Sequence, residues 1–340
     1  MPRHTKLSLN GLMLVMLGLC FASNANAQIT MYDNSITAFN INAFQDVMAS
    51  YAMQGESLSD FFKAQKMYGQ MGKIDQYGDD GTTTGSTKYI KHNDSIFKNI
   101  WADFSTTGAD LHFSGIDTKK TVMRLSSAGV NFKRFKINNG RLYLGVFGSY
   151  INADFVDKSS RGHTFEGFAR YHEDLADFMV ALNYGDMKTD LEKKDMKSQW
   201  MHFYTNAAYR FYMDETFCIQ TRLGLGYTNI TSEDYYLNET DLVHGNNYNF
   251  INLTPEIRFI KEIVDDAYGV LYAKRFISFG GKNEITVNDT QYQSIDLDNY
   301  NEVGIDAEYH IRRFVLTGGI HKQIGYIDGW NGNFNFKYEF

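Results

Sequence analysis

Cysteine and proline are nearly absent from this chain, which has two of each among its 340 residues. Cys20 and Pro2 fall within the first 27 residues, so only Cys218 and Pro255 remain beyond them. A single cysteine in that part of the chain excludes an internal disulfide.

Long apolar runs, an excess of positive charge and the usual catalytic motifs are also missing. No run of 18 apolar residues follows residue 27, which excludes a membrane-spanning helix. Lys and Arg total 33 against 40 Asp and Glu, so charge gives no reason to expect nucleic-acid binding. The sequence has no G-x-S-x-G, no H-E-x-x-H, no cysteine pair for zinc and no phosphate-binding loop. We therefore expect neither an enzyme nor a cofactor.

The N-terminus has the features of a secretory signal peptide. A basic start, MPRHTK, precedes the apolar stretch LSLNGLMLVMLGLCFA, and Ala25-Asn26-Ala27 matches an A-x-A cleavage site. We predict a cleaved signal at 1–27. Its removal takes away Arg3 and Lys6 and changes the formal net charge from −7 to −9.

Alternation of apolar and polar residues, the period of a β-strand, dominates the chain from residue 97 onward. In one example, Phe178, Val180, Leu182 and Tyr184 alternate with smaller or more polar neighbours. Twelve segments with this period are predicted as strands: 97–106, 120–134, 141–153, 163–172, 175–187, 198–212, 216–229, 248–262, 266–280, 299–310, 313–323 and 330–340.

Alternation alone fits a soluble sandwich as well as a membrane barrel, but the connections separate the two. The predicted turns near 136–140, 174–175, 213–215, 264–266 and 311–312 are short. The connections 107–119, 154–162, 188–197, 230–247, 281–298 and 324–329 are long. Short turns at one end and long loops at the other are typical of outer-membrane barrels, whereas a Greek-key sandwich does not sort its loops in this way. We predict an all-β fold, a twelve-stranded antiparallel transmembrane β-barrel over 97–340. Pro255 lies within one strand, so a bulge or a missing ladder bond is expected there.

The last strand ends on aromatic residues with the same spacing. Phe334, Phe336, Tyr338 and Phe340 share one face, and Asn333, Asn335, Lys337 and Glu339 share the other. In a barrel the aromatic face contacts lipid.

Several segments resemble the translocator domain of autotransporters, the type V secretion proteins. They are Trp101 in the first strand, SSAGVNFKRF in the second, GRLYLGVFGSYINADF in the third, GHTFEGFARYH in the fourth, INLTPEIRF in the eighth and the terminal FNFKYEF. The resemblance covers about 97–340. It implies a twelve-stranded barrel, a helix near or in its pore and an exported passenger. It also implies that Phe334, Phe336, Tyr338 and Phe340 form a signal read by the barrel-assembly machinery.

The segment before the barrel departs from that family pattern, because only residues 28–96 are available as a passenger. Two short helices are predicted, one on Ile36, Phe39, Phe44, Val47 and Tyr51 and one on Leu58, Phe61, Phe62 and Tyr68, followed by a flexible linker. This short N-terminal helical segment fits a plug or vestigial passenger and equally a small head without a transport role. It has room to lie outside the cell, in the lumen or in the periplasm.

Candidate functional residues are the charges predicted to face the lumen, which suit docking of a helix or pore selectivity. They are Arg170, Arg222, Glu256, Arg258, Glu302, Asp306 and Glu308. The simpler interpretation is that they keep the lumen wet and brace the wall by ion pairs. His163, with Ser159, Ser160 and Glu166, is the one local group of catalytic type, and ordinary loop composition explains it as well. The acidic loops 230–247 and 281–298 offer oxygen ligands for calcium but lack EF-hand spacing.

Two hypotheses of function follow. The first is an autotransporter-type barrel that translocates or anchors its own short N-terminal segment. The second is an orphan barrel acting as a pore or structural protein. Either places a monomer in the bacterial outer membrane, with membrane lipid, the barrel-assembly machinery and periplasmic chaperones as partners and without nucleic acid.

Overall fold

The computed structural model describes Leu58, Phe62 and residues 97–340 without 112–118, 133–134, 138–139, 156–157, 174, 192–193, 237–241, 281–283, 294–298 and 326. The predicted signal peptide and, apart from Leu58 and Phe62, the predicted head at 28–96 lie outside the described residues. The two predicted helices therefore stay predictions, although Leu58 and Phe62 are themselves helical.

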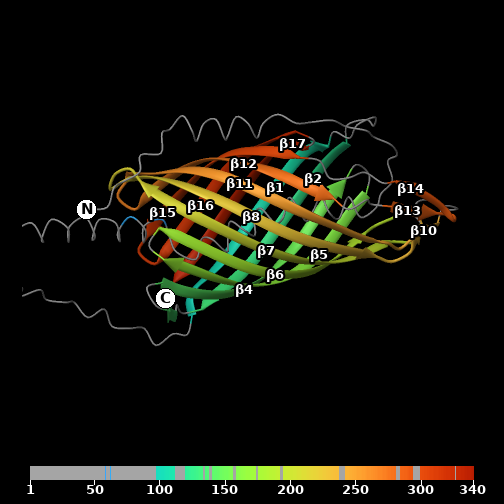
Figure 1. Cartoon of the computed structure of the whole chain (residues 1–340), viewed down its shortest axis with the longest axis horizontal. Coiled ribbons are helices and arrows are strands. Elements are labelled where there is room, and N and C mark those ends of the chain that lie inside the picture. Colours follow the sequence, from blue (N-terminus) through green and yellow to red (C-terminus); the bar gives the residue numbers. More distant parts are fainter. Residues whose placement is uncertain are drawn as a thin grey trace, which may run out of the picture.

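Twelve long antiparallel strands form a closed barrel in the described part of the chain (Figure 1). Sequence neighbours pair around the wall, β2 pairs with β4, and β1 pairs with β17 to close it. The strands are β1 (Phe97–Leu111), β2 (Lys119–Phe132), β4 (Gly140–Phe155), β5 (Lys158–Glu173), β6 (Ala176–Thr189), β7 (Met196–Tyr212), β8 (Phe217–Ser232), β11 (Asn247–Val264), β12 (Ala267–Gly280), β15 (Tyr300–Ile311), β16 (Phe314–Gly325) and β17 (Ile327–Glu339). The prediction of a twelve-stranded antiparallel barrel is confirmed.

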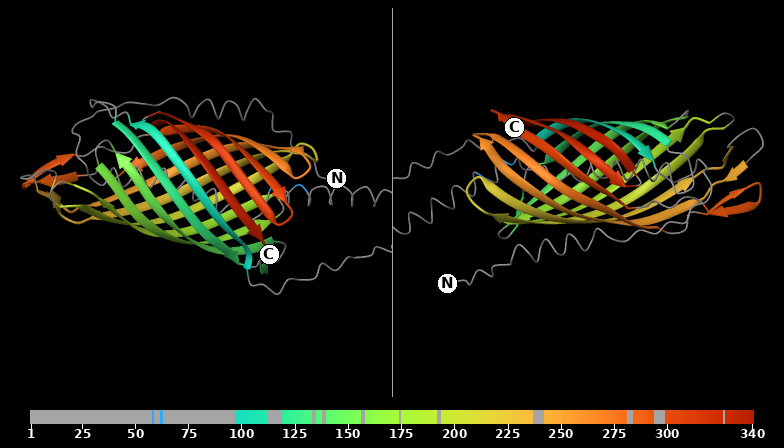
Figure 2. Two further views of the ribbon diagram at one scale, coloured as in Figure 1. Left: turned by 180° about the vertical axis from the view of Figure 1, so that it is seen from behind. Right: turned by 90° about the horizontal axis from the view of Figure 1, so that it is seen from above.

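The closing seam joins the first and last strands without a register shift. It runs from Asn99 opposite Glu339 to Leu111 opposite Ile327, and the Phe340 amide donates to the Lys98 carbonyl. Both ends of the barrel sequence thus lie at the end with the short turns. Figure 2 shows the strands crossing the barrel obliquely, as closure of a sheet requires.

Apolar side chains cover the outer face because every second residue of each strand points outward. On β6, Phe178, Val180, Leu182 and Tyr184 are all exposed, while Met179, Ala181 and Asn183 are buried on the inner face. Phe334, Phe336 and Phe340 are likewise exposed at the end of the chain. Such a surface suits contact with lipid tails rather than with water.

The short turns are of the kind that reverses an antiparallel pair tightly. Asp266 (φ 63°) and Arg312 (φ 58°) adopt the left-handed backbone region in the turns after β11 and β15. In the turn after β7, Asp214 accepts bonds from the Thr216 amide (2.7 Å) and hydroxyl (2.8 Å), which lowers the pKa of its carboxyl group.

Two of the connections that were predicted to be long are short in the structure. Those expected at 154–162 and 324–329 are short, because β4, β5, β16 and β17 continue their hairpin pairing until only 156–157 and 326 lie between strands. Hairpin hydrogen bonds satisfy the backbone there better than an open loop would.

The two acidic loops form a sheet of their own, which was not predicted. The strands β9 (Tyr235–Tyr236), β10 (Leu242–His244), β13 (Glu284–Val287) and β14 (Thr290–Gln293) lie in the order β14-β13-β10-β9, and Val243 pairs with Val287 across the two loops. Leu191, Met196 and Tyr235 pack with these valines. A further short strand, β3 (Phe135–Ile137), pairs with β4 beyond the end of β2.

Pro255 interrupts one ladder without shifting it. It pairs in register with Leu223 of β8, whereas the β11–β12 ladder passes from Leu253–Ile277 directly to Glu256–Lys274. The missing bond, one of the two predicted solutions, is therefore the one adopted.

Candidate functional site: the barrel lumen

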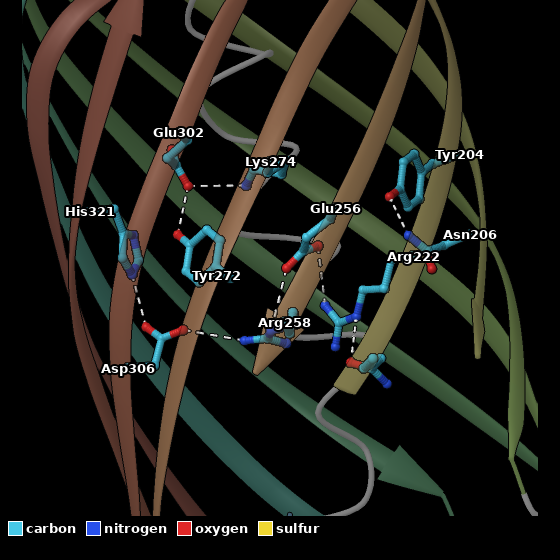
Figure 3. A network of polar contacts seen from close by, with 11 residues as sticks. Tyr204, Asn206, Arg222, Glu256, Arg258, Tyr272, Lys274, Glu302, Asp306 and His321 are labelled. Atoms are coloured by element: carbon cyan, nitrogen blue, oxygen red, sulfur yellow. Dashed lines mark hydrogen bonds and ion pairs between the residues drawn. The ribbon is translucent and has the colours of Figure 1, made fainter. Parts of the chain in front are cut away.

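The charged wall of the lumen is formed by the inner faces of β8, β11, β12, β15 and β16 (Figure 3). At its centre Asp306 of β15 contacts two side chains, Arg258 and His321. Arg258 Nη2 lies 3.2 Å from Asp306 Oδ2, and His321 Nε2 lies 2.8 Å from Asp306 Oδ1. Arg258 also places its Nε 3.3 Å from Glu256 Oε1, so the chain of ion pairs continues to β11.

Glu302 forms a second group along the same strand. Its Oε1 lies 3.1 Å from Lys274 Nζ and accepts a 2.7 Å hydrogen bond from the Tyr272 hydroxyl, while Oε2 accepts one from Gln323 Nε2 at 3.2 Å. Such nearly buried ions require partners on every side, since desolvation is costly. Glu302 therefore fixes β12, β15 and β16 relative to one another.

Arg222 of β8 completes the network. Its Nε donates to Gln220 Oε1 at 2.9 Å, and its Nη1 lies 3.7 Å from Glu256 Oε2. The cavity bordered by these charges measures about 40 Å³, room for roughly three waters. Its lining also includes Tyr204, Asn206, Thr254, Asn331 and Asn333. The described side chains thus leave a small polar cavity among these charges.

Glycines make room for the central ion pairs. A Cβ at Gly319 would collide with Asp306 Oδ1 and approach His321 Nε2 to 2.7 Å. The inner face of β16 therefore carries no side chain where the Asp306 carboxylate meets His321.

A separate charge cluster lies on β5, β6 and β7 near the short turns. The fully buried Asp177 accepts bonds from Arg170 Nε (3.0 Å) and Nη2 (2.6 Å), contacts His172 Nδ1 at 3.0 Å and forms an ion pair with Arg210. One carboxylate thus contacts side chains of β5 and β7 from its place on β6, which ties three strands together.

Glu308 contacts the segment that precedes the barrel. Its Oε1 accepts a 2.8 Å hydrogen bond from the Leu58 amide and lies 2.6 Å from His310 Nε2. One helical turn further on, Phe62 is 1 % exposed and stacks on Tyr268, with ring centroids 5.5 Å apart. Cys218, Ile260 and Val270 complete this apolar socket, with Tyr212 packed beside it. These socket residues lie near the short turns after β7 and β11.

The opposite wall, on β1 to β7, carries a cluster of apolar side chains among the polar ones that we predicted. Buried members of this wall include Trp101, Met123, Leu125, Phe147, Ile151, Phe168, Met179 and Trp200. The ring centroids of Trp101 and Phe147 lie 5.2 Å apart. The Trp200 ring covers Gly185, the residue opposite it in the ladder. An aromatic ring packed over a glycine in this way stabilises the strand at a position that has no side chain.

The structure places all seven predicted lumen residues on the inner face and divides them into three groups. Arg170 belongs to the Asp177 cluster and Glu308 to the contact with Leu58, whereas the other five belong to the network of Figure 3. The prediction missed Asp177, Lys274, His321 and Tyr272. Strand alternation is the signal that would have placed them inward, since each lies an even number of residues from an inward neighbour.

The structure does not bring the catalytic-type residues together. His163 is exposed on the outer face and packs near Tyr150, whereas Glu166 is buried on the inner face. Ser159 donates to Asp190, and Ser160 pairs with Thr189. Within the described ranges, no three His, Cys, Asp or Glu side chains are grouped as metal ligands, and no helix is long and apolar enough to cross a membrane.

Comparison with known proteins gives structural similarity alone. No protein-family model matches the sequence, and no curated protein matches it either. The β domain of the Bordetella autotransporter BrkA is 14 % identical and matches 72 % of this chain and 100 % of its own, with a TM-score of 0.57. The transport unit of AIDA-I from Escherichia coli is 15 % identical over 76 % and 94 %, with a TM-score of 0.60.

The translocator domain of NalP from Neisseria meningitidis is 11 % identical and matches 83 % of this chain and 98 % of its own, with a TM-score of 0.53. All three are autotransporter domains, in agreement with the resemblance seen in the sequence. At these identities the likeness establishes architecture. The chain therefore has the barrel fold of autotransporter translocator domains.

Proposed function

We propose that this protein is an autotransporter-type outer-membrane barrel that anchors its own short N-terminal segment, residues 28–96, in its lumen. The signal peptide at 1–27 directs it across the inner membrane, and the barrel at 97–340 inserts into the bacterial outer membrane as a monomer. No catalysis is assigned to it.

The observation that carries this proposal is the contact of Leu58 and Phe62 with the inner wall. The Leu58 amide bonds to Glu308, and Phe62 fills the socket of Tyr268, Cys218, Ile260 and Val270. Both residues belong to the 28–96 segment, and they occupy the end of the barrel where β1 begins. That end carries the short turns, which face the periplasm in outer-membrane barrels.

The outer face supports the membrane location and the partners. Exposed apolar side chains recur on successive strands, among them Leu182, Leu223, Ile305, Ile320 and Phe334, and lipid tails are the natural solvent for them. The outward aromatics Phe334, Phe336, Tyr338 and Phe340 form the proposed signal for the assembly machinery, and periplasmic chaperones protect such a chain before it inserts.

A second function, a pore, is favoured by the charged wall. Lumen charges such as Arg222, Arg258 and Glu302 resemble the lining of a selective channel. The small cavity among them and the filled socket at the mouth argue for a barrel closed by its own residues.

Protease treatment of intact cells tests where the segment lies. An epitope tag after Gln28 is compared with two reference tags, one in the Asn288–Asp289 turn of the long loops and one in the turn at Met213–Thr216. Anchoring in the lumen predicts that the Gln28 tag survives together with the Met213–Thr216 tag until the outer membrane is opened, while the Asn288–Asp289 tag is lost. Loss of the Gln28 tag in intact cells would instead show export through the barrel.

Conductance in a planar bilayer separates anchoring from the pore function. The anchored barrel conducts weakly, and deletion of residues 28–96 or the change Phe62→Ala raises its conductance. An intact protein that already conducts as well as the deletion variant would establish the pore and refute anchoring.

A further inference from the structure

Three basic residues form a row on the outer face of β5, β6 and β7. Arg161 is directly opposite Lys188 in the β5–β6 ladder, and Lys188 is directly opposite Lys197 in the β6–β7 ladder. All three point outward, with 52–64 % of each side chain exposed. Like charges directly opposite each other destabilise a sheet, so the pairing of these strands gains nothing from placing the three cations side by side.

The row lies at a defined level above the apolar surface. Four residues along each strand toward the short turns, Phe165, Tyr184 and Met201 form a row in the same register, and all are exposed. Between the two rows lie His163, Asp186 and Gln199, also in register. The outer face therefore passes from apolar to polar to cationic within each strand.

This order matches the layers of a membrane surface. Four residues span about 14 Å along a strand, or about 10 Å in height for a strand tilted by about 40°. The polar layer of a bilayer lies immediately outside the hydrocarbon core and is about 5–7 Å thick on each side. With the apolar row about 3–5 Å inside the hydrocarbon core, the cations are at the outer edge of the headgroup layer, at the end with the long loops.

Acidic residues surround the row without covering it. Lys188 contacts Asp195 (2.6 Å) and Asp190 (3.8 Å), and Arg161 lies 4.0 Å from the same Asp190. Lys197 lies 3.9 Å from Glu233. Apart from the Lys188–Asp195 contact these are long, exposed pairs of little stabilising value, and the Arg161 and Lys197 side chains stay accessible beside them.

We propose that Arg161, Lys188 and Lys197 bind the phosphate groups of lipid headgroups in the outer leaflet of the membrane. The lipid's acyl chains then lie along Phe165, Tyr184 and Met201 on the same strands. Arginine and lysine are suited to phosphate, the former by paired hydrogen bonds. This inference relies on the proposed membrane location but not on the anchoring of residues 28–96.

The test is lipid binding by the full chain in detergent, measured by native mass spectrometry. The probes are lipid A, a phosphorylated glycolipid, and the same lipid after enzymatic removal of its phosphates. The variant Arg161→Gln/Lys188→Gln/Lys197→Gln removes the row. A matched control, Arg141→Gln/Lys261→Gln/Arg313→Gln, removes three exposed cations near the short turns.

The intact chain is expected to prefer the phosphorylated lipid, and the row variant to bind it at least about tenfold more weakly, since each basic residue near an anionic lipid surface contributes several-fold. The control variant should stay within about twofold of the intact chain, and Lys188→Arg/Lys197→Arg should retain binding. Equal binding of the two lipids by the intact chain, or equal loss in the control variant, would overturn the proposal.

Folding of each variant is checked by gel mobility without heating, and single substitutions replace the triple one if it fails to fold. Exposure of the Gln28 tag has no bearing on this result, so the two proposals fail independently.

Discussion

Two regions of the lumen hold their inward side chains in place by different interactions. On β1 to β7 the inward side chains around Trp101, Phe147 and Trp200 are held by packing, and glycines on neighbouring strands accept the rings. On β8 to β16 the inward side chains around Arg258, Glu302 and Asp306 are held by ion pairs and hydrogen bonds. Packing tolerates a modest change of volume, whereas a buried ion that loses its partner strongly destabilises the fold. The charge network around Asp306 should therefore be more sensitive to single substitutions than the aromatic cluster around Trp200.

The change Asp306→Asn gives the strongest test of this contrast. It leaves Arg258 and His321 facing a neutral group in a nearly buried site, so we expect a loss of about 3–5 kcal/mol in the free energy of unfolding. Urea unfolding in detergent, followed by circular dichroism, measures it. A loss no greater than that of an exposed pair would show that the lumen is wet enough to replace the carboxylate.

Trp200→Ala tests the packed wall. Removing a fully buried indole should cost about 3 kcal/mol or slightly more, through lost contacts, the cavity left behind and the bond from Trp200 Nε1 to Asn183. Trp200→Phe serves as the control and should recover more than half of the loss in the same unfolding experiment. If both substitutions cost the same, the hydrogen bond rather than the packing holds this wall.

Glycine substitutions on the two walls compare them directly. A Cβ at Gly185 meets the Trp200 ring, and one at Gly319 meets the Asp306 carboxylate and His321. We expect Gly185→Ala to cost about 1–3 kcal/mol through overpacking. Gly319→Ala should cost at least as much, because it also separates an ion pair. The difference in urea midpoints measures this, and a smaller loss for Gly319→Ala would contradict the ranking of the walls.

The smallest effect is expected outside the lumen. Asp154 and Arg124 form a 3.0 Å ion pair on the outer face, with about half of each side chain exposed. Asp154→Asn should change the free energy of unfolding by less than about 1 kcal/mol. An effect comparable to that of Asp306→Asn would mean that burial does not distinguish the two pairs.

Alternation in the sequence predicted the strands because side chains of opposite kind must face opposite sides of a wall. Each of the twelve predicted segments overlaps one observed barrel strand, and the outward set on β6 is the one predicted. The predicted ends were less accurate near the long loops. Residues such as Asp154, Lys158 and Lys188 are charged yet remain in hairpin ladders, because a backbone ladder does not require an apolar side chain.

Within the lumen, sequence reasoning could place charges on the inner face but could not group them. Arg170 and Arg222 were predicted as one set, yet Arg170 binds Asp177 on the next strand while Arg222 lies beside Glu256. The partner depends on the register of neighbouring strands, which turn lengths and ladder shifts set together. The β10–β13 pairing of two distant loops has the same origin.

The sequence by itself determined the period, number and outward face of the strands, because these follow from local alternation and from where turns interrupt it. Only the tertiary structure decided that an aromatic cluster packs in one part of the lumen and a charge network forms in another, that Leu58 and Phe62 meet Glu308 and Tyr268, and that three cations form a row on the outer face. Each of these depends on which residues of separate strands or segments lie side by side. Closure of the barrel fixes that arrangement, and no single strand encodes it.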